Sequence, residues 1–208
     1  MDNIKKNFKN PTSEYRSAPF WSWNDVMDGE ELARQLRDFK AHGMGGAFAH
    51  PRVGMVTEYL SEEYFDAWKA ALDAVKEEDM KLYIYDENSW PSLMAGGLVC
   101  KKDPDTLPVI AKYRVVRPEG PNSFPGPIFY AAVFKDNALG MNLTDIPFEK
   151  WGEYTSDDVI VFYQFKTWDG IWHGNCPMPD LTNPRTTELF LELTYEEYYK
   201  RFGEDFGT

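Results

Sequence analysis

Three short apolar segments of the chain are each followed by polar and aromatic side chains that could bind a hydroxyl-rich ligand. Carboxylate, imidazole, amide and guanidinium groups hydrogen-bond hydroxyls, and aromatic rings offer an apolar face on which a sugar ring can stack. These residue types therefore indicate a site for a neutral sugar. The candidate binding residues are Trp21, Trp23 and Asn24 toward the end of the first segment, His50 and Arg52 at the end of the second, and Asp86, Glu87 and Trp90 after the third.

Asp86 and Glu87 are the candidates for acid or base chemistry in this set. Cleavage of a glycosidic bond uses two carboxyl groups placed across the bond. Adjacent residues of an extended strand point to opposite sides, so we expect at most one of these two to face a substrate. The other would cap a loop or bind a backbone amide or a cation. The sequence leaves open which of the two faces the site.

Several of these residues also have a structural interpretation. Trp21 and Trp23 are two residues apart and share one face of a strand. Their rings could form the floor of a sugar subsite or pack under helices. His50 could bind a substrate hydroxyl or be satisfied within the fold. His173 and Cys176 are three residues apart, but they lack two further ligands nearby, and we interpret them as structural.

Alternating strands and helices are predicted to position the three clusters. The segments 18–25, 45–52 and 81–85 are typical of short buried strands, and Asp28 and Ser61 are typical helix-start residues. Strands that alternate with amphipathic helices predict consecutive βα units with a parallel sheet. The carboxyl ends of such strands open on one face, where ligands bind.

The spacing of the strand ends does not choose between two parallel architectures. It is 26 residues from Asn24 to His50 and 36 residues from His50 to Asp86. Both intervals suit a (β/α)8 barrel and an open doubly wound sheet. A dinucleotide fingerprint would favour the second, but Gly43-x-Gly45-Gly46 precedes a strand instead of following one.

The pattern changes after the third strand. Residues 109–116, 128–135 and 159–166 are β-rich and are separated by turns that contain Gly and Pro. A helical pattern returns with Thr182 or Asn183 as the cap and ends near Gly203. We therefore expect an irregular lead-in at 1–17, the first βα units of a TIM-type barrel at 18–106, a small antiparallel β insertion at 107–179, and a barrel helix at 180–208, with the chain ending before a fourth strand.

Composition narrows the class of partner. The 208 residues carry 22 Lys and Arg against 34 Asp and Glu, a net charge of −12, so nucleic acid and anionic membranes are not expected partners. No stretch approaches the ~20 apolar residues of a membrane span, and the N-terminus has no apolar signal segment. We expect a cytoplasmic protein with reduced cysteines. Aromatic residues make up 16% of the chain, which suits a sugar ligand or an aromatic core.

Taken together, the strand-end motifs resemble glycoside hydrolase family 106, the α-L-rhamnosidase-like enzymes. The motifs are Pro19-Phe20-Trp21-Ser22-Trp23-Asn24, Gly45-Gly46-Ala47-Phe48-Ala49-His50-Pro51-Arg52 and Tyr85-Asp86-Glu87-Asn88-Ser89-Trp90-Pro91-Ser92, followed by Thr194-Tyr195-Glu196-Glu197-Tyr198-Tyr199. The resemblance implies the first part of a (β/α)8 catalytic domain and an inverting hydrolysis by two carboxylates, with calcium as a cofactor in some members. It also implies that the principal catalytic carboxylates lie on later strands.

One position departs from that family's pattern. Sequences of the family usually have Gly after the Pro-Ser of the third motif, where this chain has Leu93. This departure affects the expected loop conformation and the placement of Ser92.

Two hypotheses of function follow. The first is the N-terminal portion of a rhamnosidase-like hydrolase, which binds a rhamnose-containing glycoside and is inactive as an isolated fragment. The alternative is a non-catalytic sugar-binding or interaction protein built on a half-barrel, which would dimerise to cover its exposed sheet edges. A sugar hydrolase of another family with the same barrel is also compatible with the motifs.

Overall fold

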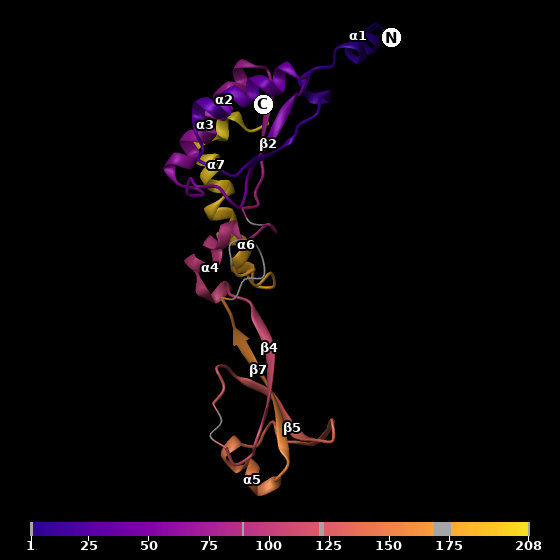
Figure 1. Ribbon diagram of the computed structural model, residues 1–208, viewed down its shortest axis with the longest axis vertical. Coiled ribbons are helices and arrows are strands. Elements are labelled where there is room, and N and C mark those ends of the chain that lie inside the picture. Colours follow the sequence, from indigo (N-terminus) through magenta and orange to yellow (C-terminus); the bar gives the residue numbers. More distant parts are fainter. Residues whose placement is uncertain (1, 89, 121–122, 169–175, 208) are drawn as a thin grey trace. The chain divides into compact units, whose positions relative to one another are not determined.

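The computed structural model describes residues 2–88, 90–120, 123–168 and 176–207 (Figure 1). The chain forms two compact units, one from residues 1–106 and 170–208 and the other from residues 107–169. Each unit has its own cluster of buried hydrophobic residues. None of the helices in the described ranges is both long enough and apolar enough to cross a membrane.

The first unit contains a three-stranded parallel sheet whose strands follow one another in space as they do in the chain. Helices α2 and α3 connect the strands, and the antiparallel sheet of the second unit follows, so the predicted mixed α/β class is confirmed. Both predicted helix starts are also confirmed, because the Asp28 and Ser61 side chains accept from the backbone N–H of Glu31 and Tyr64. The elements are β1 (Phe20–Trp23), α2 (Gly29–Ala41), β2 (Gly46–Pro51), α3 (Glu62–Glu77) and β3 (Lys81–Ile84).

Aromatic residues fill the core between the sheet and its helices. The Trp23 ring lies 5.7 Å from that of Tyr64 on α3, and the Trp68 ring lies 5.1 Å from that of Tyr198. The hydroxyls of Tyr64 and Tyr198 are 2.7 Å apart. These contacts join α3 to α7 (Tyr195–Phe202), the last long helix of the chain. Much of the aromatic content is therefore core.

The C-terminal helical pattern forms two helices where the sequence predicts one. Asn183 is the cap, because its side chain accepts from the Arg185 N–H, but α6 (Pro184–Leu193) ends before α7 begins. The backbone breaks at Thr194, with φ −111° and ψ −86°. The Phe190 carbonyl accepts from both the Thr194 N–H at 3.0 Å and the Thr194 hydroxyl at 2.5 Å, and such a back-bonded Thr is often found where a helix bends.

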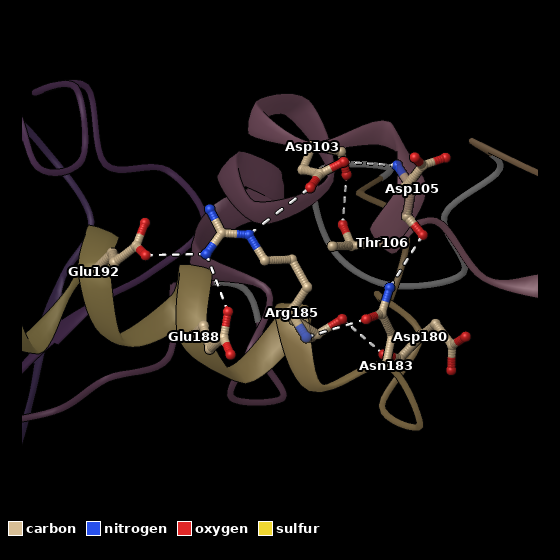
Figure 2. A network of polar contacts seen from close by, with 9 residues as sticks. Asp103, Asp105, Thr106, Asp180, Asn183, Arg185, Glu188 and Glu192 are labelled. Carbon is tan, nitrogen blue, oxygen red and sulfur yellow. Dashed lines mark hydrogen bonds and ion pairs between the residues drawn. The ribbon is translucent and has the colours of Figure 1, made fainter.

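Polar contacts in the first unit join the chain just before residue 107 to the chain from residue 180 onward, as Figure 2 shows for most of them. The Asp180 N–H donates to the Thr106 carbonyl at 2.7 Å, and Asn183 Nδ2 donates to the Asp105 carbonyl at 3.3 Å. These residues lie between α4 (Leu98–Lys102) and α6. Arg185 lies 3.9 Å from Asp103, 3.2 Å from Glu188 and 3.0 Å from Glu192.

The second unit is a four-stranded antiparallel sheet with strand order β4-β7-β5-β6. The three predicted strands are present, and β6 is an addition. All five residues of β6 are exposed, so the strand has no alternating pattern to mark it. The buried Trp151 side chain belongs to the core of this unit. The elements are β4 (Val109–Val116), β5 (Ile128–Lys135), β6 (Ala138–Asn142), α5 (Trp151–Tyr154) and β7 (Asp158–Lys166).

The sequence predicts an irregular lead-in at 1–17, but the structure contains helical segments there. It contains α1 (Asp2–Lys9) and a short 3-10 helix at Ser13–Tyr15. The apolar side chains of α1, Ile4 and Phe8, are 74% and 88% exposed. Ile4 and Phe8 are four residues apart and share one helix face, but two apolar residues in a short, otherwise polar segment are a weak signal for a helix.

Candidate functional site

The sheet face opposite α2 and α3 carries a cluster of rings from Phe20, which begins β1, His50, near the carboxyl end of β2, and Tyr85, which follows β3. The Phe20 and His50 ring centroids are 4.3 Å apart, those of His50 and Tyr85 are 4.3 Å apart, and those of Phe20 and Tyr85 are 4.8 Å apart. Side chains alternate along a strand, so Phe20 lies on the face opposite Trp21 and is half exposed. We call Phe20, His50 and Tyr85 the aromatic face.

His50 is the buried member of the aromatic face. It is 5% exposed, and its Nδ1 atom has no hydrogen-bond partner among the described residues. Burial and the nearby Arg52 guanidinium lower the pKa of His50, while Glu87 opposes this shift. The imidazole is therefore neutral at pH 7.

Side-chain hydroxyls surround Asp86 and Glu87, and the Ser92 hydroxyl lies within donating distance of both carboxylates. The Tyr195 hydroxyl donates to Asp86 Oδ2 at 3.2 Å, and the Tyr85 hydroxyl donates to Glu87 Oε2 at 2.6 Å. The Ser92 hydroxyl lies 3.0 Å from Asp86 Oδ1 and 3.2 Å from Glu87 Oε1. We call these five residues the carboxylate chain.

The carboxylate chain corrects the expectation that the two adjacent carboxylates point apart. That expectation assumes an extended strand, but β3 ends at Ile84 and the acidic pair lies in the irregular loop beyond it. Both side chains therefore reach the same Ser92 hydroxyl. Among the described residues their partners are side-chain hydroxyls, whereas the sequence predicts a backbone amide or a cation for one of them.

The two tyrosine hydroxyls of the carboxylate chain stay protonated over the physiological range. Burial, followed by the hydrogen bond to Glu87, raises the pKa of Tyr85 to about 12. Burial, followed by the Asp86 charge, raises the pKa of Tyr195 to about 12. Both groups therefore act as hydrogen-bond donors to the carboxylates.

The structure separates the two predicted tryptophans from this site. Trp21 and Trp23 are 6% and 1% exposed and belong to the core under the helices. The Trp21 Nε1–H donates to Gln35 Oε1 of α2 at 2.7 Å. This placement favours the packing alternative over a sugar-stacking floor.

The remaining predicted residues stay on the surface of the strand-end region. Asn24 and Arg52 are exposed, and Trp90 is 53% exposed. Of the eight predicted residues, the described contacts bring together His50, Asp86 and Glu87, with Arg52 acting on His50 through its charge.

Sequence reasoning misses four contributors: Phe20, Tyr85, Ser92 and Tyr195. The first three stand inside the quoted strand-end motifs, and strand alternation could have identified Phe20 as the residue opposite the buried tryptophans. Tyr195 is 109 positions from its partner Asp86. No local pattern signals a contact over that distance.

The described residues do not assemble a calcium site. No group of three or more His, Cys, Asp or Glu side chains within the described ranges could hold a metal ion. Asp86 and Glu87 supply two carboxylates at one place, whereas Ca²⁺ takes six to eight oxygen ligands. Burial raises the pKa of the Cys100 and Cys176 thiols, and the Cys176 thiol donates to the Gly96 carbonyl at 3.2 Å. His173 lies outside the described residues.

The loop after the acidic pair has a left-handed backbone at several residues. Leu93 has φ 76° and Ala95 has φ 47°, and Gly96 and Gly97 follow with φ 64° and 87°. Positive φ favours glycine. Leu93 stands where the sequences that the strand-end motifs resemble usually have Gly, and its backbone is strained in this chain.

Comparison with known proteins gives a distant structural likeness. No protein-family model matches the chain, and no curated protein matches it in sequence. Among solved structures, the chain is similar to part of a rhamnosidase from Novosphingobium sp. PP1Y, with a TM-score of 0.41 and 18% sequence identity. The match covers 63% of this chain and 13% of that chain, so the chain spans a small part of that protein's length.

Proposed function

We propose that this chain supplies the sugar-binding part of a glycoside hydrolase that acts on terminal α-L-rhamnosyl or similar glycosidic bonds. The observation that carries the proposal is the position of two adjacent carboxylates, Asp86 and Glu87, beside the aromatic face. The strand-end motifs support the choice of rhamnosyl glycosides among sugars.

The chemistry of the carboxylate chain favours a neutral polyol as ligand. Each carboxylate oxygen has more than one acceptor position, so the pair can accept from ligand hydroxyls in addition to Tyr85, Ser92 and Tyr195. An anionic ligand would meet two like charges. The half-exposed Phe20 ring offers an apolar surface for the C–H face of a pyranose.

Asp86 and Glu87 are suited to binding and not to acting as the two carboxylates of an inverting hydrolysis. Inverting enzymes hold their two carboxyl groups about 6.5–9.5 Å apart to admit a water. Here the nearest oxygens of both groups lie within hydrogen-bond distance of one Ser92 hydroxyl. That hydroxyl fills the space in which the sugar bond would have to lie.

The test is binding and turnover by the 208-residue protein. Titration with methyl α-L-rhamnopyranoside, followed by NMR, should give saturable shifts that D86N and E87Q weaken about tenfold, the size of one lost charge-assisted hydrogen bond. Glu30→Gln, which changes an exposed carboxylate on α2, serves as the control and should leave the affinity unchanged.

Two results would count against the proposal. Absence of saturable binding would remove the sugar-binding assignment. Hydrolysis of an aryl α-L-rhamnoside by the 208-residue protein, abolished by D86N or E87Q, would show that the pair is catalytic and not only a binding element.

A second candidate is a sugar-binding protein that functions as a homodimer. In the described residues β1 and β3 each pair on one side only, and Tyr83 beside this edge is 39% exposed. Unpaired strand edges promote association between chains. Sedimentation equilibrium at micromolar concentration tests this, because a dimer supports the candidate and a well-folded monomer contradicts it.

A further inference from the structure

We propose that Tyr195 is a positioning residue of the candidate site, which acts on a bound sugar only through the Asp86 carboxylate. This inference rests on the proposed function, since it concerns the same site. Tyr195 comes from α7 and Asp86 from the loop after β3, and the two residues are 109 positions apart. The contact therefore ties the loop after β3 to α7.

The donors around the acidic pair are distributed so that each carboxylate has one tyrosine of its own. Tyr195 donates to Asp86 Oδ2, Tyr85 donates to Glu87 Oε2, and Ser92 lies between the two remaining oxygens. With both of its oxygens in contact with a hydroxyl, Asp86 is held in one rotamer. Loss of the Tyr195 hydroxyl frees one oxygen and lets that side chain turn about Ser92.

Packing fixes the Tyr195 ring independently of its hydroxyl. The ring lies 6.1 Å from that of Phe190, at an interplanar angle of 72°, and Phe190 is 3% exposed. The backbone break at Thr194 starts α7 at Tyr195. A Tyr195→Phe variant should therefore keep the helix and the ring in place and remove only the hydrogen bond to Asp86.

A double-mutant cycle on sugar affinity tests whether Tyr195 acts through Asp86. With methyl α-L-rhamnopyranoside as the probe, Y195F should weaken binding about tenfold in the wild-type background and less than about twofold in the D86N background. Tyr199→Phe, on the same helix and 60% exposed, is the matched control and should bind as the wild type. An equal loss in both backgrounds, or no loss in either, would overturn the proposal.

A measurement without ligand keeps the test decisive if D86N abolishes binding or if the chain binds no sugar. The ¹³Cζ signal of Tyr195, identified by its disappearance in Y195F, reports the titration of this hydroxyl. In D86N the pKa of Tyr195 should fall from about 12 by roughly one unit, because the neighbouring negative charge is gone. An unchanged pKa would show that Tyr195 does not engage Asp86, whatever the outcome of the sugar titration.

Discussion

The imidazole of His50 is held between the rings of Phe20 and Tyr85, and its environment makes the protein's stability depend on pH. Its pKa in the folded protein is lowered, first by burial and then by Arg52, whereas the unfolded chain has the ordinary value near 6.5. The unfolded state therefore binds more protons as the pH falls through that range. Stability contributed by His50 is fully present above about pH 6.5 and is lost on acidification below it.

Urea unfolding between pH 7 and pH 5 should detect this contribution. We expect the free energy of unfolding to fall over this range in the wild type and to fall less in His50→Gln. His42→Gln, which changes an exposed histidine at the end of α2, should not remove the fall that His50 causes. If the free energy of unfolding fell equally between pH 7 and pH 5 in the wild type and in His50→Gln, the assignment to His50 would be contradicted.

Leu93 offers a second test at the residue scale, because it combines a strained backbone with core packing. Its φ is 76°, and its side chain packs against the core of the first unit. Leu93→Ala loses the packing and keeps the strain, whereas Leu93→Gly loses the packing and relieves the strain. We expect L93G to be more stable than L93A by about 1 kcal/mol, as measured by chemical denaturation.

Leu98 is the matched control for Leu93. It packs against the same core but begins α4 with a helical φ of −63°. At this site the order should reverse, with L98G less stable than L98A by about 0.5–1 kcal/mol, because glycine is a poor helix former. If L93G were less stable than L93A, as expected for the pair at Leu98, the backbone of Leu93 would not be strained.

At the scale of the elements, α6 has an N-cap that also connects it to the chain before residue 107. The Asn183 Oδ1 accepts from the Arg185 N–H at 3.0 Å, and its Nδ2 donates to the Asp105 carbonyl at 3.3 Å. Asn183→Ala removes both bonds, while Asn183→Asp keeps the cap oxygen and removes the donor. Stability should therefore fall in the order wild type, N183D, N183A.

The size of the Asn183 effect follows from known caps. Loss of a side-chain N-cap costs about 0.5–2 kcal/mol. The free energy of unfolding of N183A should therefore be lower than that of the wild type by an amount in this range or more. Thermal unfolding in moderate salt, which screens the Asp105 and Asp180 charges, measures the order. If N183D were as unstable as N183A, the connection to Asp105 and not the cap would dominate.

Burial determines which elements the sequence predicts. β1, β2 and β3 are apolar segments beside a core, and their positions follow from that pattern. α1 and β6 have no buried stripe, so the same reasoning passes over them. The break at Thr194 is a change of backbone angles at a single residue, which hydrophobic periodicity does not encode.

The candidate site is less predictable than the fold, because its contacts are made between loops and across long separations. His50 stands near the carboxyl end of β2, and Asp86 and Glu87 follow β3, at the positions along the chain where the sequence pattern places them. Their geometry depends on where β3 stops and on Tyr195, which belongs to a different part of the chain. The two tryptophans illustrate the opposite case, since their spacing fits both a sugar floor and a core, and only burial decides between the two.

At the scale of the whole molecule, the two chain segments of the first unit that flank the second unit in sequence are hydrogen-bonded to each other. Thr106 and Asp180 are joined by a backbone hydrogen bond of 2.7 Å, and the two units have separate cores. Replacing residues 109–168 with Gly-Ser-Gly-Ser leaves residues 169–179 to complete the connection to Asp180. At about 3.3 Å per residue, these eleven residues and the linker easily span a gap whose two ends are hydrogen-bonded neighbours.

We therefore expect the shortened protein to fold and to keep the core of the first unit. A shorter connection has a smaller loop-closure entropy, so the free energy of unfolding of this unit should not decrease. In ¹H–¹⁵N spectra the indole signals of Trp151 and Trp168 should vanish with the removed residues, and those of Trp21, Trp23 and Trp68 should keep their positions. Collapse of these three signals to the chemical shifts of unfolded chains would show that the first unit needs the second in order to fold.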